Sequence, residues 1–225
     1  MLRKNHEQSI IDGFFDHFKN IADQHGENLT RCSSDGQDKL LGGDYIFTNH
    51  TRFVLAEFKY EEKDIKSEKK KTGRLNLCKN LDRHERRLQQ SISCHFIGWS
   101  TRQHDRSVEF NKYYHEVCNT FIFPQTKALR QKAPNYNERR KADMLIKDFL
   151  DGNIGATYKA FELYIEWLLK LEGGGTNSVE LLTRDPTSKS MRMIDFNSVK
   201  ELKIWLDYIR PSQARKNNPG NSFNL

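Results

Sequence analysis

The chain has 225 residues, of which 36% are hydrophobic, so it is long enough for one large core domain or a core domain with an appended segment. Its 37 Lys and Arg residues outnumber 30 Asp and Glu residues, and the net charge of +7 favours polyanionic partners such as nucleic acid. No stretch approaches the roughly 18 apolar residues of a membrane-spanning helix, and no apolar signal region opens the sequence. We therefore expect a cytoplasmic protein without membrane contact.

The four cysteines, Cys32, Cys78, Cys94 and Cys118, are widely spaced and form no C-x-x-C pair. We therefore expect reduced thiols rather than a disulfide framework. His115 with Cys118, together with Cys94 and His95, leaves a structural zinc site as an alternative. The spacing does not favour it, because it lacks the paired ligands of a zinc module.

Residues 5–22 place apolar side chains at helical spacing and predict an amphipathic helix. Four residues before Ile11 on its apolar stripe lies Glu7, so a carboxylate stands at the edge of the face that meets the rest of the fold. We expect a short strand over residues 29–33. The segment DYIFTNHTRFVLAEFKY (44–60) then predicts two strands around a polar turn at residues 49–52, the strongest hairpin signal in the chain.

The next segment, YEEKDIKSEKKKTGR (60–74), is dense in charge and almost free of apolar residues, which predicts a solvated loop. Residues 79–93 have the pattern of a helix. Short apolar runs at 95–100 and 118–124 predict two further strands.

The character of the chain changes after residue 124. We expect helices over 141–150 and 156–171, a hairpin over 179–196, and a last helix from Asn197 or Ser198 through Ile209 that Pro211 stops. The aromatic residues of the second helix indicate core more than a partner surface. Gly173 to Gly175 predict a flexible turn, since no phosphate-loop motif follows them.

The hairpin places three charged residues on one face. With a two-residue turn at His50-Thr51, paired residues sum to 101, so Asp44 lies opposite Glu57, and Lys59 shares their face. Two opposed carboxylates repel each other unless a cation neutralises them. Mg²⁺ or Mn²⁺ suits such an oxygen site, and Lys59 could then orient or activate an attacking water. The alternative is an ordinary charged surface.

Asp44, twelve intervening residues and then Glu57-Phe58-Lys59 resemble the D…(D/E)-x-K motif of the PD-(D/E)XK nuclease superfamily. The resemblance implies that Asp44, Glu57 and the Phe58 carbonyl hold the metal ion, that Lys59 serves the water, and that Glu7 is a further catalytic residue and metal ligand. It also suggests Gln90 as a supporting residue. Gly43 replaces the proline of the motif.

The resemblance implies an α/β fold of the α+β kind. Its core over residues 1–124 is expected to be restriction-endonuclease-like, or Holliday-junction-resolvase-like, with the order α-β-β-β-α-β and a central mixed sheet. Residues 125–210 form a mostly helical extension with a small hairpin, which could pack on the same domain. Residues 211–225 are expected to be a disordered tail.

The sequence therefore predicts a Mg²⁺-dependent endonuclease that hydrolyses DNA, in phage (antiviral) defence, restriction, mobile-element or repair work. A homodimer and a helicase or ATPase partner remain open, and so do an RNA-cleaving enzyme and a non-cleaving binding or interaction subunit of the same fold. The candidates for nucleic-acid contact are basic, although interleaved acids make a self-neutralised surface the alternative. They are Lys69, Lys70, Lys71, Arg74, Arg83 and Arg87.

Overall fold

The computed structural model describes residues 6–34, 41–102, 105–171, 180–185 and 188–216, with the side chains of 210–216 left aside. Its helices are α1 (Glu7–Gln24), η1 (Glu62–Lys70), α3 (Arg74–Arg83), α4 (Glu85–Cys94), α5 (Tyr113–Val117), η2 (Tyr136–Glu138), α6 (Ala142–Leu150), α7 (Tyr158–Leu171) and α8 (Val199–Lys216). Its strands are β1 (Thr30–Ser33), β2 (Tyr45–Thr48), β3 (Arg52–Glu61), β4 (His95–Arg102), β5 (Arg106–Lys112), β6 (Arg140–Lys141), β7 (Ala156–Thr157), β8 (Leu181–Arg184) and β9 (Met193–Phe196).

The strands form one central sheet in the order β6-β5-β4-β3-β2-β1-β8-β9, with β7 paired to the start of β3. β3 and β4 run parallel, whereas the other pairings among the described strands are antiparallel. The fold is thus of the α+β class. The predicted order of helix, three strands, helix and strand is present in α1, β1 to β3, α3 with α4, and β4.

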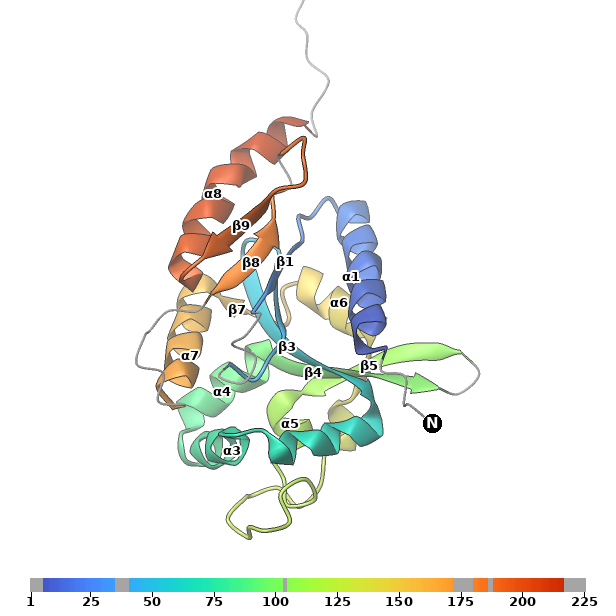
Figure 1. Ribbon diagram of the computed structural model, residues 1–225, viewed down its shortest axis with the longest axis vertical. Coiled ribbons are helices and arrows are strands. Elements are labelled where there is room, and N and C mark those ends of the chain that lie inside the picture. The colour runs from blue at the N-terminus through green and yellow to red at the C-terminus, as the bar shows by residue number, and fades with distance from the viewer. Residues whose placement is uncertain (1–5, 35–40, 103–104, 172–179, 186–187, 217–225) are drawn as a thin grey trace, which may run out of the picture.

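Helices cover both faces of this sheet (Figure 1). On one face α1 packs through Phe14 and Phe18 against Phe47 and Phe58 of the strands, and Phe149 of α6 packs against Phe18. On the other face α3, α4, α5, α7 and α8 form a second, larger hydrophobic cluster. The amphipathic pattern of α1 therefore has the expected partner, because its apolar stripe lies on the sheet.

The predicted hairpin and its register are confirmed. Four pairs, from Tyr45 opposite Ala56 to Thr48 opposite Phe53, sum to 101. The Asn49 side chain shapes the turn, since its Oδ1 accepts the backbone amides of Thr51 at 3.2 Å and Arg52 at 2.8 Å.

Three local predictions are wrong. Residues 62–70 are not a solvated loop but the 3-10 helix η1, which buries Ile65 and the Glu68 carboxylate. The helix expected over 79–93 is two helices that meet at His84. Residues 118–124 form a turn rather than a strand, because the Asn119 side chain caps the Ile122 amide at 3.0 Å. The strand β5, which precedes this turn, was not predicted.

The C-terminal part of the chain joins the same sheet. β6 pairs with β5, β7 with β3, and β8 with β1, so residues 125–210 extend the core. α8 continues beyond Pro211 to Lys216, so the predicted helix stop at Pro211 is wrong. A proline inside a helix removes one hydrogen bond and crowds the carbonyl four residues before it, at a local cost in stability. Gly173 to Gly175 and residues 217–225 lie outside the described residues.

The expectation of four reduced thiols is also wrong. Cys78 of α3 and Cys118, just after α5, form a disulfide, whereas Cys32 and Cys94 are free and buried. The two partners are 40 residues apart in sequence, so only the tertiary fold brings them together. Disulfides are rare in reducing compartments. The cytoplasmic location therefore stays a prediction that this bond does not favour. Within the described ranges, no helix is long and apolar enough to cross a membrane.

Candidate active site

Asp44 is fixed beside Glu57 by backbone hydrogen bonds. It stands at the point where the chain enters β2, and its amide donates to the Ala56 carbonyl at 2.8 Å. The Phe58 amide in turn donates to Oδ2 of Asp44 at 2.7 Å. The Asp44 carboxylate thus takes the place of a backbone carbonyl as acceptor at the end of the β2–β3 pairing. This hydrogen bond holds the carboxylate next to β3.

The replacement of the motif proline by Gly43 has a packing reason. A Cβ atom at this position would lie 2.6 Å from Leu55, a fully buried residue of β3. Any larger residue would push the segment that carries Asp44 away from the strand.

Lys59 lies deep in the same cluster, as the alternation along β3 predicts. Its ammonium group is paired with Glu57 and with Glu68 at 3.0 Å, and it donates to the Phe58 carbonyl at 3.1 Å. Burial lowers the pKa of Lys59, but the two carboxylates outweigh burial and raise it. Lys59 is therefore charged at neutral pH and is suited to orient a water or stabilise an anion rather than accept a proton.

Glu7 reaches the cluster from the opposite layer, in the first turn of α1. Burial raises the pKa of its carboxyl group, the Lys59 charge lowers it and the Glu57 charge raises it. The backbone of Tyr60 also hydrogen bonds to it. The helix layer thus contributes Glu7, and the sheet contributes Asp44 and Glu57. These three acids share one charged cluster with Lys59.

The acids repel one another. Burial raises the pKa of Asp44, and the neighbouring Glu57 charge raises it further, whereas Lys59 opposes the shift; the result is a pKa of about 7. An Asp carboxyl group ordinarily titrates near pH 4. A divalent cation at this point would favour the ionised form of Asp44.

One oxygen of Glu57 lacks a partner. Oε1 is paired with Lys59 and with Lys71 at 2.5 Å, but Oε2 is buried without a hydrogen-bond partner among the described residues. A buried carboxylate oxygen in this state needs a donor or a cation. The donor set fits a hard metal ion, since it offers carboxylates and the Phe58 carbonyl. Within the described part of the chain, however, no three His, Cys, Asp or Glu side chains are close enough to form a ready metal cluster.

No family model matches this chain. No curated protein and no solved structure matches it either. The assignment of the site therefore depends on its own geometry and on the motif.

The sequence did not reveal the further buried charges that surround these residues. Glu68 is fully buried; burial raises its pKa, but Lys59, Lys71, the Tyr113 hydroxyl and Arg74 outweigh burial and lower it to about 2. The one available signal was the pattern Ile65-x-x-Glu68, which places an apolar and an acidic residue on one side of a helical turn within an otherwise polar segment.

The other candidate residues lie apart from this cluster, with two exceptions. Lys71 contacts Glu57, and Arg74 is fully buried against Glu68 at 3.3 Å, so Arg74 cannot contact a nucleic acid as expected. Lys69 and Lys70 are exposed on η1, and Arg83 is exposed at the end of α3.

Arg87 and Gln90 serve helix packing in the described structure. Arg87 donates to Gln90 at 2.8 Å and to the Leu163 carbonyl at 3.0 Å, and Gln90 donates to the Ala160 carbonyl at 3.3 Å. Because α7 covers this side of α4, the two side chains point to α7 instead of the acids. His115 hydrogen bonds to Gln131 at 3.5 Å.

Proposed function

We propose that the protein is a metal-dependent endonuclease that hydrolyses phosphodiester bonds of DNA with Mg²⁺ or Mn²⁺. The observation that carries the proposal is the buried, unpartnered Oε2 of Glu57, beside an Asp44 whose pKa is raised to about 7. Lys59 and Lys71 pair with Oε1 of Glu57, but Oε2 has no hydrogen-bond partner among the described residues, and the motif would place a metal ion at this side of the carboxylate. The order of elements and the position of Glu7 on α1 support membership of the PD-(D/E)XK superfamily.

Asp44, Glu57 and the Phe58 carbonyl would hold the ion, with Glu7 as a further ligand directly or through water. When bound, the ion would polarise a phosphate oxygen and lower the pKa of a bound water. The Phe58 amide keeps Asp44 in place for this role, since it already binds Oδ2.

Lys59 would act on the attacking water and on the charge that develops at phosphorus. Its ammonium group is held by Glu57 and Glu68, so its position is set before substrate binds. A preorganised cation in a buried site stabilises a developing anion without reorganisation.

DNA is the proposed substrate because the chain carries a net charge of +7 and several exposed basic residues near the site. Lys69 and Lys70 directly follow Glu68 on η1, and both are exposed. Such residues could contact phosphates beyond the scissile bond.

Cleavage assays with isosteric variants test the proposal. The full chain is incubated with supercoiled plasmid, single-stranded DNA and RNA in Mg²⁺, Mn²⁺ or EDTA. We expect metal-dependent cutting by the wild type, and a loss of at least about 100-fold in Asp44→Asn, Glu57→Gln and Lys59→Met. On the first helix, Glu7→Gln should reduce cutting, whereas its matched control Asp16→Asn should not.

Equal cutting by the wild type and Glu57→Gln would contradict the proposal, because the activity would then come from another site or protein. Binding of DNA without cutting, and without Mn²⁺ binding in a titration, would favour a non-cleaving subunit. Cleavage of RNA alone would support the proposed site but would make RNA the substrate instead of DNA.

A further inference from the structure

The segment 62–71 delivers a carboxylate and a lysine to the candidate site. Glu68 and Lys71 are three residues apart, and the Lys71 amide donates to the Glu68 carbonyl at 3.1 Å, so their backbones are held together. Glu68 is fully buried in a segment that is otherwise mostly exposed. Burial of a carboxylate is costly unless cations and hydrogen bonds compensate it, so the placement needs a reason.

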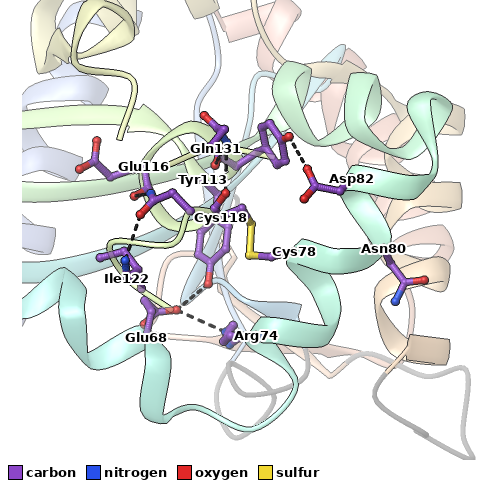
Figure 2. Close-up of a disulfide and its surroundings, with 12 residues drawn as sticks. Glu68, Arg74, Cys78, Asn80, Asp82, Tyr113, Glu116, Cys118, Ile122 and Gln131 are labelled. Atoms are coloured by element: carbon purple, nitrogen blue, oxygen red, sulfur yellow. Dashed lines mark hydrogen bonds and ion pairs between the residues drawn. A yellow bond between two sulfur atoms is a disulfide. The ribbon is translucent and has the colours of Figure 1, made fainter. Parts of the chain in front are cut away.

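The two oxygens of Glu68 have different partners. Oε2 accepts the Tyr113 hydroxyl at 2.6 Å and faces Nε of Arg74 at 3.3 Å, as Figure 2 shows. Both partners belong to the scaffold, since the Cys78–Cys118 disulfide joins α3, which begins at Arg74, to the end of α5, which begins at Tyr113. Oε2 therefore anchors Glu68.

The other oxygen, Oε1, faces the site. The ammonium group of Lys59 lies 3.0 Å from it and that of Lys71 lies 3.3 Å from it. Both lysines also contact Oε1 of Glu57. Glu68 thus holds two ammonium groups side by side at one carboxylate of the proposed metal site.

The two lysines differ in depth. The Lys59 side chain is 7% exposed, and that of Lys71 is 23% exposed. A phosphate that enters from solvent would therefore meet Lys71 before Lys59. An ammonium group has three donors. Lys71 donates one hydrogen bond to Glu57 and forms an ion pair, without a hydrogen bond, with Oε1 of Glu68, so it keeps a donor for a phosphate oxygen.

We propose that Lys71 is a second catalytic lysine, which binds the scissile phosphate, and that Glu68 is the positioning residue for both lysines. This inference rests on the nuclease function proposed above. Lys59 then serves the water from inside the site, while Lys71 neutralises a non-bridging phosphate oxygen from the solvent side. No bond of the protein changes in this step, because Lys71 only donates a hydrogen bond.

Single-turnover cleavage of supercoiled plasmid in saturating Mn²⁺ tests the role of Lys71 in the full chain. We expect Lys71→Met to lower the rate by about 100-fold, as the loss of one transition-state donor does elsewhere. Lys71→Arg should recover part of the rate, because it keeps the charge. The matched control is Lys63→Met, which removes an exposed lysine from the same segment, 62–71, and should change the rate by less than about threefold.

A double-mutant cycle tests the role of Glu68. Glu68→Gln keeps an oxygen that can accept the Tyr113 hydroxyl but removes the charge that holds the lysines. If Glu68 acts through Lys71, the effect of Lys71→Met should shrink from about 100-fold to less than about tenfold in the Glu68→Gln background. A purely structural role would lower the thermal midpoint and leave the two effects multiplicative. Lys71→Gln replaces Lys71→Met if the methionine variant does not fold.

Two failures can be told apart. If the wild type cuts and Lys71→Met cuts as fast as Lys63→Met, the role of Lys71 is overturned and the nuclease function stands. If the wild type neither binds Mn²⁺ nor cuts plasmid, single-stranded DNA or RNA, the proposed function is overturned, and the role of Lys71 with it.

Discussion

At the scale of single residues, the site depends on charges that are buried beside each other. Glu57 and Glu68 are inaccessible to solvent, and Lys59 nearly so. Charges of this kind add little net stability, because desolvation offsets most of their attraction, but the loss of one partner is strongly destabilising. The proposed chemistry would give this cluster a use beyond stability.

His95 supports the segment that leads into Asp44. Its Nε2 donates to the Gly42 carbonyl at 2.7 Å, two residues before Asp44, and its Nδ1 accepts the Tyr164 hydroxyl at 2.9 Å. The assignment of donor and acceptor follows because a carbonyl can only accept. Burial lowers the pKa of His95 to about 3, and the Arg74 charge lowers it too, while Gly42 and Glu68 oppose the shift.

The low pKa of His95 predicts a pH-dependent contribution to stability. The unfolded chain takes up a proton at His95 below about pH 6.5, whereas the folded protein does so only near pH 3, so stability is lost as the pH falls. Between pH 7 and pH 5, the wild type should lose about 2 kcal/mol relative to His95→Gln. Urea unfolding at several pH values measures this difference. The raised pKa of Asp44 makes a contribution to stability that grows as the pH falls. This contribution is present in both proteins and therefore cancels in the difference. A constant difference across this range would contradict the assignment.

At the scale of elements, two links connect α3 to α5. The Cys78–Cys118 disulfide is one link. The other is Asp82 of α3, which accepts the Tyr114 hydroxyl at 2.6 Å and the Arg130 amide at 3.0 Å. Because these two helices supply the anchors of Glu68, their attachment sets the position of the charges in η1 (Figure 2).

The disulfide should stabilise the protein by about 2–4 kcal/mol, since it closes a long loop in the unfolded chain. We expect reductant to lower the urea midpoint of the wild type and to leave that of the Cys78→Ser, Cys118→Ser double variant unchanged. Denatured, unreduced wild type should show two titratable thiols, from Cys32 and Cys94. Four thiols in that assay would mean that the bond does not form.

At the scale of the whole molecule, much of the fold follows from local pattern. The hairpin register could be predicted because its turn and its alternation agree, and Asp44, Glu57 and Lys59 fall together as a consequence. The helices α1, α6 and α7 each show an apolar stripe at helical spacing, and β4 contains the short apolar run Phe96 to Trp99.

The rest depends on contacts between distant segments. In the sequence, the charged residues of η1 have the pattern of a solvent-exposed surface. The burial of Glu68 follows only from the fold, in which Arg74 and Tyr113 contact its carboxylate. The strand β5 is polar in sequence, and its pairing with β4 decides its structure. Cys78 and Cys118 show no local spacing, so their bond could not be read from the chain.

The most direct test of the central claim is a crystal of the protein soaked in Mn²⁺ and measured for anomalous scattering. We expect one peak bound to Oε2 of Glu57 and to the Asp44 carboxylate, at about the 2.0–2.2 Å typical of small divalent ions and oxygen ligands. The peak should vanish in Glu57→Gln. A wild-type crystal with no anomalous density between Asp44 and Glu57 at saturating Mn²⁺ would contradict the account.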